Sequence, residues 1–297
     1  MTARTPARVR VLVAALAVLV LAAAAIVVAV WQRGSAPDAA PAPQETTPVA
    51  TARPSPTPTP TGPPPDTTAH DLAGLLPAQV FSVNPAVPLD DAPDAATTGL
   101  VAQAKGAAPV FAEPGGEPVA VLPREQQHGG VVVPIVAREE HWVQVLLAGR
   151  QGVPPEGSSA QTAGWLRVTD VDIAENPHVV EVSLSAGTID IVTGGHRERI
   201  ADRFAWGTDA TPTPLGRSFI MTTAVTEYAY TRGHPIVYLS VQSPTLAGFD
   251  GADVAVTAFH YHDVREGPIS NGCIRVDPDA ITRLASLPAG TPVHIAA

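Results

Sequence analysis

An uninterrupted apolar run, Val11–Trp31, limits most strongly what this chain can fold into. About 21 apolar residues are enough for a helix to cross the hydrocarbon core of a bilayer. Three arginines precede the run (Arg4, Arg8 and Arg10) and only one follows closely, so residues 1–10 are expected to stay in the cytoplasm. The apolar core of a cleaved signal peptide usually spans only about 7–15 residues, so the length favours an uncleaved anchor over the alternative of cleavage. Both alternatives predict export of the remaining chain.

The next stretch, residues 32–69, is rich in proline and contains R-P-S-P-T-P-T-P-T-G-P-P-P. Such a tract cannot bury a hydrophobic core, and its prolines favour extended polyproline II at about 3.1 Å per residue. We therefore expect a disordered spacer that holds the later domains away from the membrane. Residues 70–104 form a connecting segment without a clear pattern. The expected location is the cell membrane, with a single span and the folded part outside the cytoplasm.

The charge of the chain argues against a nucleic-acid partner. The formal net charge is −10, and the basic residues do not form a stripe. Nucleic-acid binding depends on lysines and arginines that neutralise phosphates. The membrane, contacted through the N-terminal helix, is the first partner that the sequence indicates.

Residues 105–173 alternate short β-prone stretches with turn residues, which predicts a small barrel of about 65 residues. The expected strands are Pro109–Ala112, Val119–Leu122, Val131–Ala137, Trp142–Leu147 and Gly164–Val168. The motifs A-P-V-F-A-E-P, H-W-V-Q-V and A-G-W-L-R-V resemble those of bacterial SH3-like domains of envelope proteins. The resemblance implies a module that binds or positions the protein at the cell wall; a packing domain without a ligand is the alternative.

Residues 177–297 are expected to form a second, mostly β domain with one short helix. The expected strands are Val179–Leu184, Thr188–Thr193, Arg199–Trp206, Arg217–Val225, Ile236–Val241, Val254–His262 and Val293–Ala296. The helix is placed between Pro278 and Leu287, because Asp277 suits the N-cap position and Pro278 the first helical position.

The only cysteine of the chain, Cys273, lies in the stretch F-H-Y-H-D-V-R-E-G-P-I-S-N-G-C-I-R-V. A lone cysteine cannot form an intrachain disulfide, so it is either a small buried hydrophobe or a reactive thiol. Alternation along the strand Val254–His262 places His260 and His262 on one face. A loop over Asp263–Ile269 then returns Cys273 to the end of that strand. An imidazole there could accept the thiol proton and generate the nucleophilic thiolate.

The neighbours of Cys273 fit acyl transfer. Gly272 allows close approach of a substrate carbonyl, and the amides around Gly272 and Cys273 are candidate oxyanion donors. Arg275 could bind a substrate carboxylate or hold the loop, and Ser270 suits a loop hydrogen bond better than a second nucleophile. Two histidines without a clustered third ligand make a poor zinc set. We expect neither a metal nor an organic cofactor.

Three motifs occur in the order V-V-E-V-S-L-S-A-G-T-I-D-I-V, T-P-T-P-L-G and S-N-G-C-I-R-V. Together they resemble the L,D-transpeptidase (YkuD-like) catalytic domain, over residues 177–297. The resemblance implies a β-sandwich or barrel that cross-links peptidoglycan stem peptides. A cysteine of this family attacks the third residue of a tetrapeptide stem, releases terminal D-Ala and passes the acyl group to an amine of a neighbouring stem. Carbapenem-type inhibitors are expected from the same resemblance.

Carried over by position, the resemblance makes Cys273 the nucleophile, Gly272 part of the oxyanion loop and Arg275 the arginine of the motif. His260 is favoured as the base because it follows an apolar residue, as in the family. His262 is the alternative base, or it orients His260 or the substrate.

Ser270, Asn271 and Tyr238 complete the expected substrate-binding set. Residues 226–250, which contain Tyr238, take the place of the family's substrate-covering lid, with core packing as the alternative role of the tyrosines. Asn271 stands where the family often has histidine, and the loop between histidine and cysteine is short. An L,D-carboxypeptidase, a sortase-like transpeptidase and a non-catalytic wall-binding protein are therefore the alternative functions.

Overall fold

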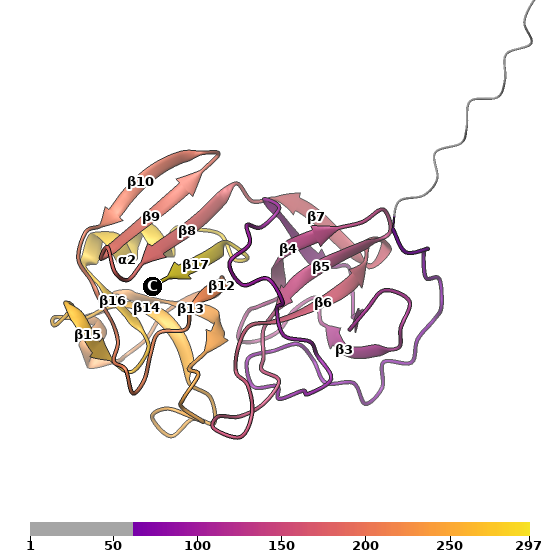
Figure 1. The fold of residues 1–297 in the computed structure, drawn as a ribbon, viewed down its shortest axis with the longest axis horizontal. Helices are drawn as coiled ribbons and strands as arrows, with labels where there is room; N and C mark the ends of the chain where they lie inside the picture. Colours follow the sequence, from indigo (N-terminus) through magenta and orange to yellow (C-terminus); the bar gives the residue numbers. More distant parts are fainter. Residues whose placement is uncertain (1–61) are drawn as a thin grey trace, which may run out of the picture. The chain divides into compact units, whose positions relative to one another are not determined.

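The computed structural model describes residues 62–297 (Figure 1). The expected cytoplasmic N-terminus, the apolar anchor and most of the proline-rich spacer lie outside the described residues. Within residues 62–297, the structure contains no helix with the length and apolarity needed to cross a membrane. This part of the chain is mostly β with one short α-helix, which confirms the predicted class, and all of it falls in one compact unit.

The first sheet contains seven strands in the order β3-β2-β6-β5-β4-β1-β7, and all neighbours that pair within it are antiparallel. The strands are β1 (Leu100–Ala104), β2 (Ala108–Phe111), β3 (Pro118–Leu122), β4 (Val132–Arg138), β5 (Trp142–Leu147), β6 (Thr162–Arg167) and β7 (Val171–Glu175). A 3₁₀ turn, η1 (Val168–Asp170), joins β6 to β7. The five strands expected here are present. The other two, β1 and β7, pair with each other, and the likeness to SH3-like domains stays a prediction.

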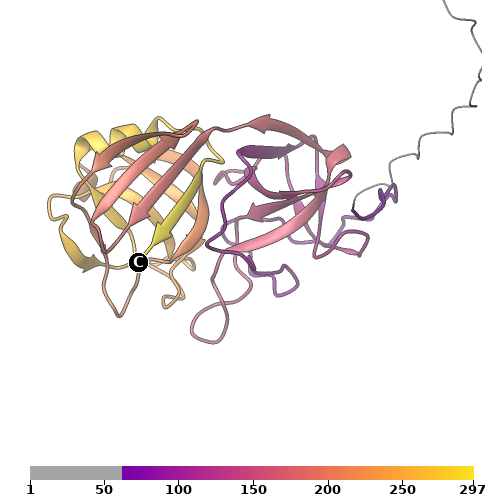
Figure 2. The same cartoon turned by 45° about the horizontal axis from the view of Figure 1, so that its top comes forward.

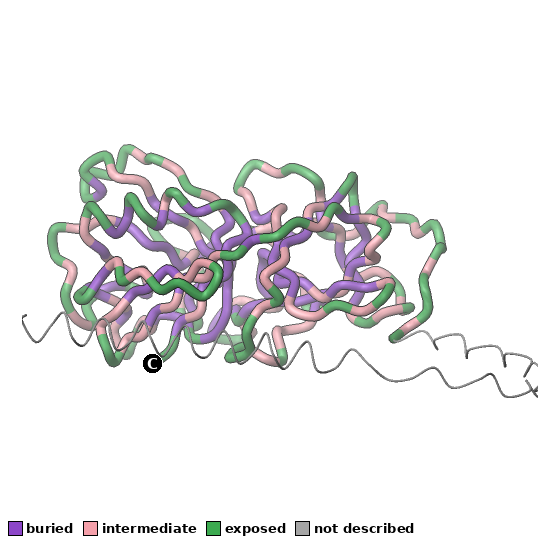
Figure 3. Tube along the Cα trace, turned by 90° about the horizontal axis from the view of Figure 1, so that it is seen from above, coloured by how far each residue is buried: buried purple, intermediate pink, exposed green. Residues whose placement is uncertain are grey.

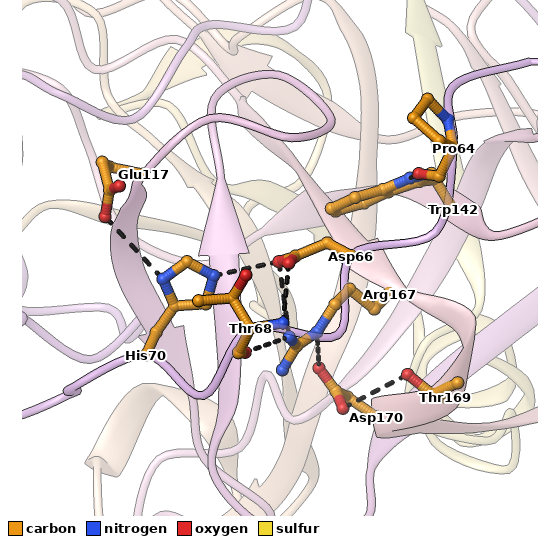
Figure 4. Close-up of polar contacts among 9 residues, drawn as sticks. All are labelled: Pro64, Asp66, Thr68, His70, Glu117, Trp142, Arg167, Thr169 and Asp170. Carbon is orange, nitrogen blue, oxygen red and sulfur yellow. Dashed lines mark hydrogen bonds and ion pairs between the residues drawn. The ribbon is translucent and has the colours of Figure 1, made fainter.

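The last residues of the expected spacer contact the first sheet (Figure 4). The indole Nε1 of Trp142 donates to the carbonyl of Pro64 at 2.9 Å, and His70 lies 2.9 Å from the carboxylate of Asp66. Arg167 donates to the carbonyl of Thr68 at 2.8 Å and pairs with Asp66 at 3.4 Å. The hydrogen bond with His70, followed by those with Thr68, holds the pKa of Asp66 well below its usual range. Residues 64–70 are therefore fastened to the first sheet.

The second sheet contains ten strands in the order β10-β9-β8-β17-β12-β13-β14-β16-β11-β15. They are β8 (His178–Ser183), β9 (Thr188–Thr193), β10 (His196–Ala201), β11 (Ala205–Gly207), β12 (Gly216–Val225), β13 (Pro235–Gln242), β14 (Val256–Tyr261), β15 (Gly267–Ser270), β16 (Ile274–Val276) and β17 (Pro292–Ala296). A 3₁₀ turn, η2 (Ala229–Thr231), lies between β12 and β13.

Two expectations about this sheet were wrong. The single strand expected over Arg199–Trp206 is divided into β10 and β11, which lie far apart in the strand order. The loop expected over Asp263–Ile269 ends in a strand, β15, because residues 267–270 find a parallel partner in β11. Glycine and proline at its start made this segment read as a turn.

The α-helix, α2 (Pro278–Ala285), begins as predicted. The Asp277 carboxylate accepts hydrogen bonds from the amides of Asp279 and Ala280, and Pro278 occupies the first turn, where a missing N–H costs nothing. Ala280, Ile281 and Leu284 form the buried face. This face packs the helix against β13 and β14 on one side of the sheet (Figure 2).

The two sheets share a buried boundary. Phe219 and Met221, both on β12, belong to the apolar cluster of the first sheet. Arg217 forms a two-pronged ion pair with Asp90, in which both side chains are nearly inaccessible (Figure 3). Breaking such a pair leaves an uncompensated buried charge. The first sheet is therefore a packing partner of the domain that carries Cys273.

Candidate active site

Cys273 and His260 are brought together by a parallel strand pair. In the β14–β16 ladder, Phe259 lies opposite Ile274 and His260 lies opposite Arg275. Cys273 directly precedes β16, so the same register places it beside Ala258. Because side chains alternate along a strand, Cys273, Arg275 and His260 lie on one face of the sheet.

The thiol of Cys273 is half-buried, and the structure records it as a free cysteine. Its Sγ lies 3.8 Å from the carbonyl oxygen of Val256. Burial raises the pKa of the Cys273 thiol above its ordinary value; the nearby amide of Ala258 and the charge of Arg275 act in the opposite direction. The resting form near neutral pH is therefore the thiol, and a base is needed to make it nucleophilic.

The imidazole of His260 is well placed to be that base. Its side chain is buried, and its Nδ1 lies 2.8 Å from the carbonyl oxygen of Tyr261, an acceptor only, so Nδ1 carries the proton. The second nitrogen, Nε2, then keeps a free lone pair. Burial lowers the pKa of His260 to about 4, and the charges of Arg275 and His262 act in the same direction. His260 is consequently neutral at pH 7 and able to accept a proton.

His262 has the opposite tautomer. Its Nδ1 accepts the amide N–H of Val264 at 2.9 Å, so in the neutral ring the proton sits on Nε2. The rings of His260 and His262 are 6.3 Å apart, as expected for residues on one face. Burial, followed by the charge of Arg275, lowers the pKa of His262. In this arrangement His262 offers a donor rather than a basic nitrogen.

The loop before Cys273 is held from within by Ser270. The Ser270 hydroxyl donates to the carbonyl of Cys273 at 2.6 Å and accepts the amide of Gly272 at 3.1 Å. The side chain is buried. Ser270 therefore acts as a loop hydrogen-bonder, and the Gly272 amide, an expected oxyanion donor, is engaged by Ser270 in this structure.

The same loop is held from outside by the turn T-P-T-P-L-G. Thr211 donates its hydroxyl to the carbonyl of Ser270 at 3.1 Å. Thr213 donates to the carbonyl of Gly272 and accepts the amide of Gly207, both at 2.9 Å. Gly272 has φ +109°, a conformation that residues with a Cβ rarely adopt, and an added Cβ would lie 3.4 Å from the carbonyl oxygen of Pro212. The turn thus fixes the backbone on which the nucleophile stands.

Replacing Thr213 with valine should lower turnover about 10-fold while the protein stays folded. Valine keeps the shape but leaves a buried amide and a buried carbonyl without partners, which costs about 1–3 kcal/mol. The thermal midpoint should fall by several degrees, and the rate of Cys273 acylation should fall with it. Thr211→Val, which removes the more exposed contact, is the matched control and should have the smaller effect. Equal losses in both variants would contradict the special role of Thr213.

Arg275 and Asn271 flank the thiol in different ways. Arg275 is half-buried; its Nη1 lies 3.5 Å from the carbonyl of Val264, and its buried Nε has no partner among the described residues. Asn271 is exposed and lines a small hollow together with Cys273, Gly272 and Phe249. The hollow is the place where a substrate carbonyl could reach the thiol.

Tyrosines cover the same face. Tyr238 lies on β13 opposite Ala258, which places it beside Cys273. Tyr230 packs edge-on against His260, with ring centroids 5.1 Å apart, and stacks on Tyr228. Burial, followed by the charge of Cys273, raises the pKa of Tyr230 to about 12, so it stays a neutral donor.

The continuous lid expected over residues 226–250 was wrong in its middle. Residues 235–242 form the buried strand β13, because alternating apolar residues there complete the sheet. Two loops remain around the site, residues 226–234 and 243–255.

Residues 177–295 match the family model described as the YkuD L,D-transpeptidase catalytic domain. These residues form a YkuD domain. The match covers less than half of the chain and includes the whole site around Cys273. No curated protein matches the chain.

Solved structures resembling this chain include several L,D-transpeptidases. One from Stackebrandtia nassauensis is 19% identical with a TM-score of 0.31; the match covers 42% of this chain and only 57% of that one. One from Mycobacterium smegmatis is 13% identical with a TM-score of 0.32, covering 53% and 91%. An LD transpeptidase in complex with imipenem is 15% identical with a TM-score of 0.33, covering 64% and 98%.

Sequence reasoning assigned no role to several residues that shape the YkuD domain's site. Thr211 and Thr213 were noticed only as part of a turn, and Phe249 was not singled out. The spacing of T-P-T-P-L-G was the available signal for the two threonines. Within residues 62–297, no group of three histidine, cysteine or acidic side chains is arranged to hold a metal ion.

Proposed function

We propose that the YkuD domain is a peptidoglycan L,D-transpeptidase with Cys273 as nucleophile and His260 as base. The observation that carries the proposal is the pairing, on one sheet face, of a lone thiol with a buried imidazole whose Nε2 is free to accept a proton. The match of residues 177–295 to the family model supports this reaction class.

In the first step, Nε2 of His260 takes the proton of Cys273 as Sγ attacks the carbonyl of the third residue of a tetrapeptide stem. The bond from that carbonyl to terminal D-Ala breaks, and the departing amine takes the proton from His260. A thioester joins the stem to Sγ. Both reacting groups start neutral, because burial raises one pKa and lowers the other, so no resting charge pair must be desolvated.

In the second step, an amine of a neighbouring stem attacks the thioester. His260 accepts a proton from that amine and returns it to Sγ, so the new amide forms and the thiol is restored. The tyrosines around Cys273 and the exposed Asn271 are proposed to bind the stem, and Arg275 to bind a carboxylate or support the loop. With water in place of the amine, the same thioester gives the carboxypeptidase product.

The setting of this reaction is also part of the proposal. The apolar run at Val11–Trp31 would anchor the chain in the cell membrane, and the spacer would carry the domains toward the wall. The first sheet would serve as an SH3-like module that positions the YkuD domain there. Membrane fractionation of cells expressing the chain tests the anchor, and recovery in the soluble fraction would count against it.

The deciding experiment is mass spectrometry of products formed from purified tetrapeptide stems. Release of D-Ala with formation of a stem dimer is expected from the wild type, and neither is expected from Cys273→Ala. Tripeptide without dimer would assign the carboxypeptidase instead. Wall binding without any thiol-dependent product would support the non-catalytic alternative.

A further inference from the structure

Residues 243–255 form a small hairpin beside the nucleophile. Phe249 and Ala252 exchange backbone hydrogen bonds of 3.1 and 3.0 Å across the turn. Asp250 and Gly251 at its tip both have positive φ, at 49° and 80°, as a tight two-residue turn requires. Most of the hairpin is exposed to solvent, so it has little core of its own to keep it in place.

The first sheet supplies the strongest hold on this hairpin through Arg150. This arginine follows β5, and only 5% of its surface is exposed. Its Nη1 donates to the carbonyl of Ala247 at 2.9 Å and its Nη2 to the carbonyl of Asp253 at 2.6 Å. The two carbonyls lie on opposite arms of the hairpin, so one guanidinium joins both arms.

The burial of Arg150 is costly, which makes a packing role alone a poor explanation. Both contacts are to backbone carbonyls rather than carboxylates, and its Nε is buried without a partner among the described residues. Burial lowers the pKa of Arg150. A buried charge without a matched ion pair destabilises a fold by itself.

Two further contacts fasten the ends of the hairpin. Ser159, from the loop between β5 and β6, donates its hydroxyl to the carbonyl of Ser243 at 2.7 Å. Thr245 donates to the carbonyl of Ala210 at 3.0 Å, next to the turn that holds the nucleophile loop. The hairpin is therefore tied to the first sheet on one side and to the turn on the other.

The held hairpin reaches the reacting group. Phe249 and Ala255 line the same hollow as Cys273 and Gly272, and the next residue, Val256, has its carbonyl 3.8 Å from Sγ. A shift of the hairpin would change both the shape of the hollow and the exposure of the thiol.

We infer that Arg150 is a positioning residue for the reaction at Cys273, acting from the first sheet through residues 243–255. The first sheet thereby completes the wall of the substrate hollow. The inference rests on the proposed function for its catalytic consequence. Its structural part, the anchoring of the hairpin, stands apart from that function.

The test compares Arg150→Ala with the wild type, using the full chain in detergent. Hydrogen–deuterium exchange over residues 243–255 should become at least about 10-fold faster, because the lost hydrogen bonds to a charged group are worth more than a factor of ten. Alkylation of Cys273 by iodoacetamide should accelerate at least threefold, as a roughly expected effect of thiol exposure. Turnover of the tetrapeptide stem should fall about 10- to 100-fold through kcat.

Two controls separate positioning from general stability. Asp90→Asn breaks another buried contact between the first sheet and the YkuD domain, away from the hairpin, and should lower the melting temperature without faster exchange at residues 243–255. Arg150→Lys, which keeps the charge and can still reach a carbonyl, should restore part of the kcat. Where Arg150→Ala does not fold, Arg150→Gln carries the same expectations.

Exchange at residues 243–255 equal to that of the wild type in a folded Arg150 variant would overturn the inference. So would an equal acceleration in Asp90→Asn. Exchange and alkylation need no stem peptide, so a wild type without stem turnover would refute the proposed function while these readouts still decide the anchoring by Arg150.

Discussion

Replacing Cys273 with alanine is expected to lower L,D-transpeptidation by more than about 1,000-fold, because a covalent route has no substitute without its nucleophile. The variant should also yield no covalent adduct with imipenem, which would otherwise add its mass to the chain. Cys273 is the only cysteine, so intact-protein mass spectrometry reads the acylated residue without ambiguity.

The fold should survive this change. Alanine removes one half-buried sulfur whose Sγ makes only a long 3.8 Å contact, so the thermal midpoint should move by no more than a few degrees. Cys273→Ser is the matched control, since it keeps the size but offers a far less acidic group. An undiminished imipenem adduct on Cys273→Ala would show that the acylated residue lies elsewhere.

Replacing His260 with glutamine is expected to lower kcat/KM by about 100- to 10,000-fold, the usual worth of a general base. The structure gives the reason: Nε2 of His260 is free, whereas the neutral ring of His262 presents a proton. His262→Gln is the matched control and should lose no more than about 10-fold. A larger loss in His262→Gln than in His260→Gln would reverse the assignment of the base.

The same base predicts how activity depends on pH. Protonation of His260 removes its lone pair, so activity is lost as pH falls through the pKa of His260, which burial lowers from its ordinary value of 6.5 to about 4. At pH 5.5, kcat/KM should therefore stay close to its value at pH 7, provided that circular dichroism shows an intact fold. An acidic limb centred near 6.5 would contradict a buried His260 as the base.

How much of this site the sequence could predict depended on the distance over which each contact forms. The placement of His260, His262 and Cys273 followed from alternation along one strand and a short return of the chain. The roles of Thr213 and Arg150 could not be found in this way, because their partners lie 59 and about 100 residues away. Such contacts depend on how strands are ordered in the sheet, which local patterns do not contain.

The fold shows the same division. Strong alternation and clear turn residues made most central strands and α2 predictable. The strand β15 was missed because Gly267 and Pro268 have low strand propensity, and its pairing with β11 outweighed that preference. The choice between the two histidines also had to wait for the structure, because only the hydrogen bond at each Nδ1 distinguishes their tautomers.

The parallel ladder of β14 and β16 places the reacting pair independently of the loop that joins them. Register in a sheet is all-or-none, since a slip of one residue would turn Cys273 to the opposite face, away from His260. Partial misalignment therefore has no partially active form. Catalysis by this chain is a strict reporter of correctly paired strands, and residues can be added or removed in the loop between them as long as the ladder itself is kept.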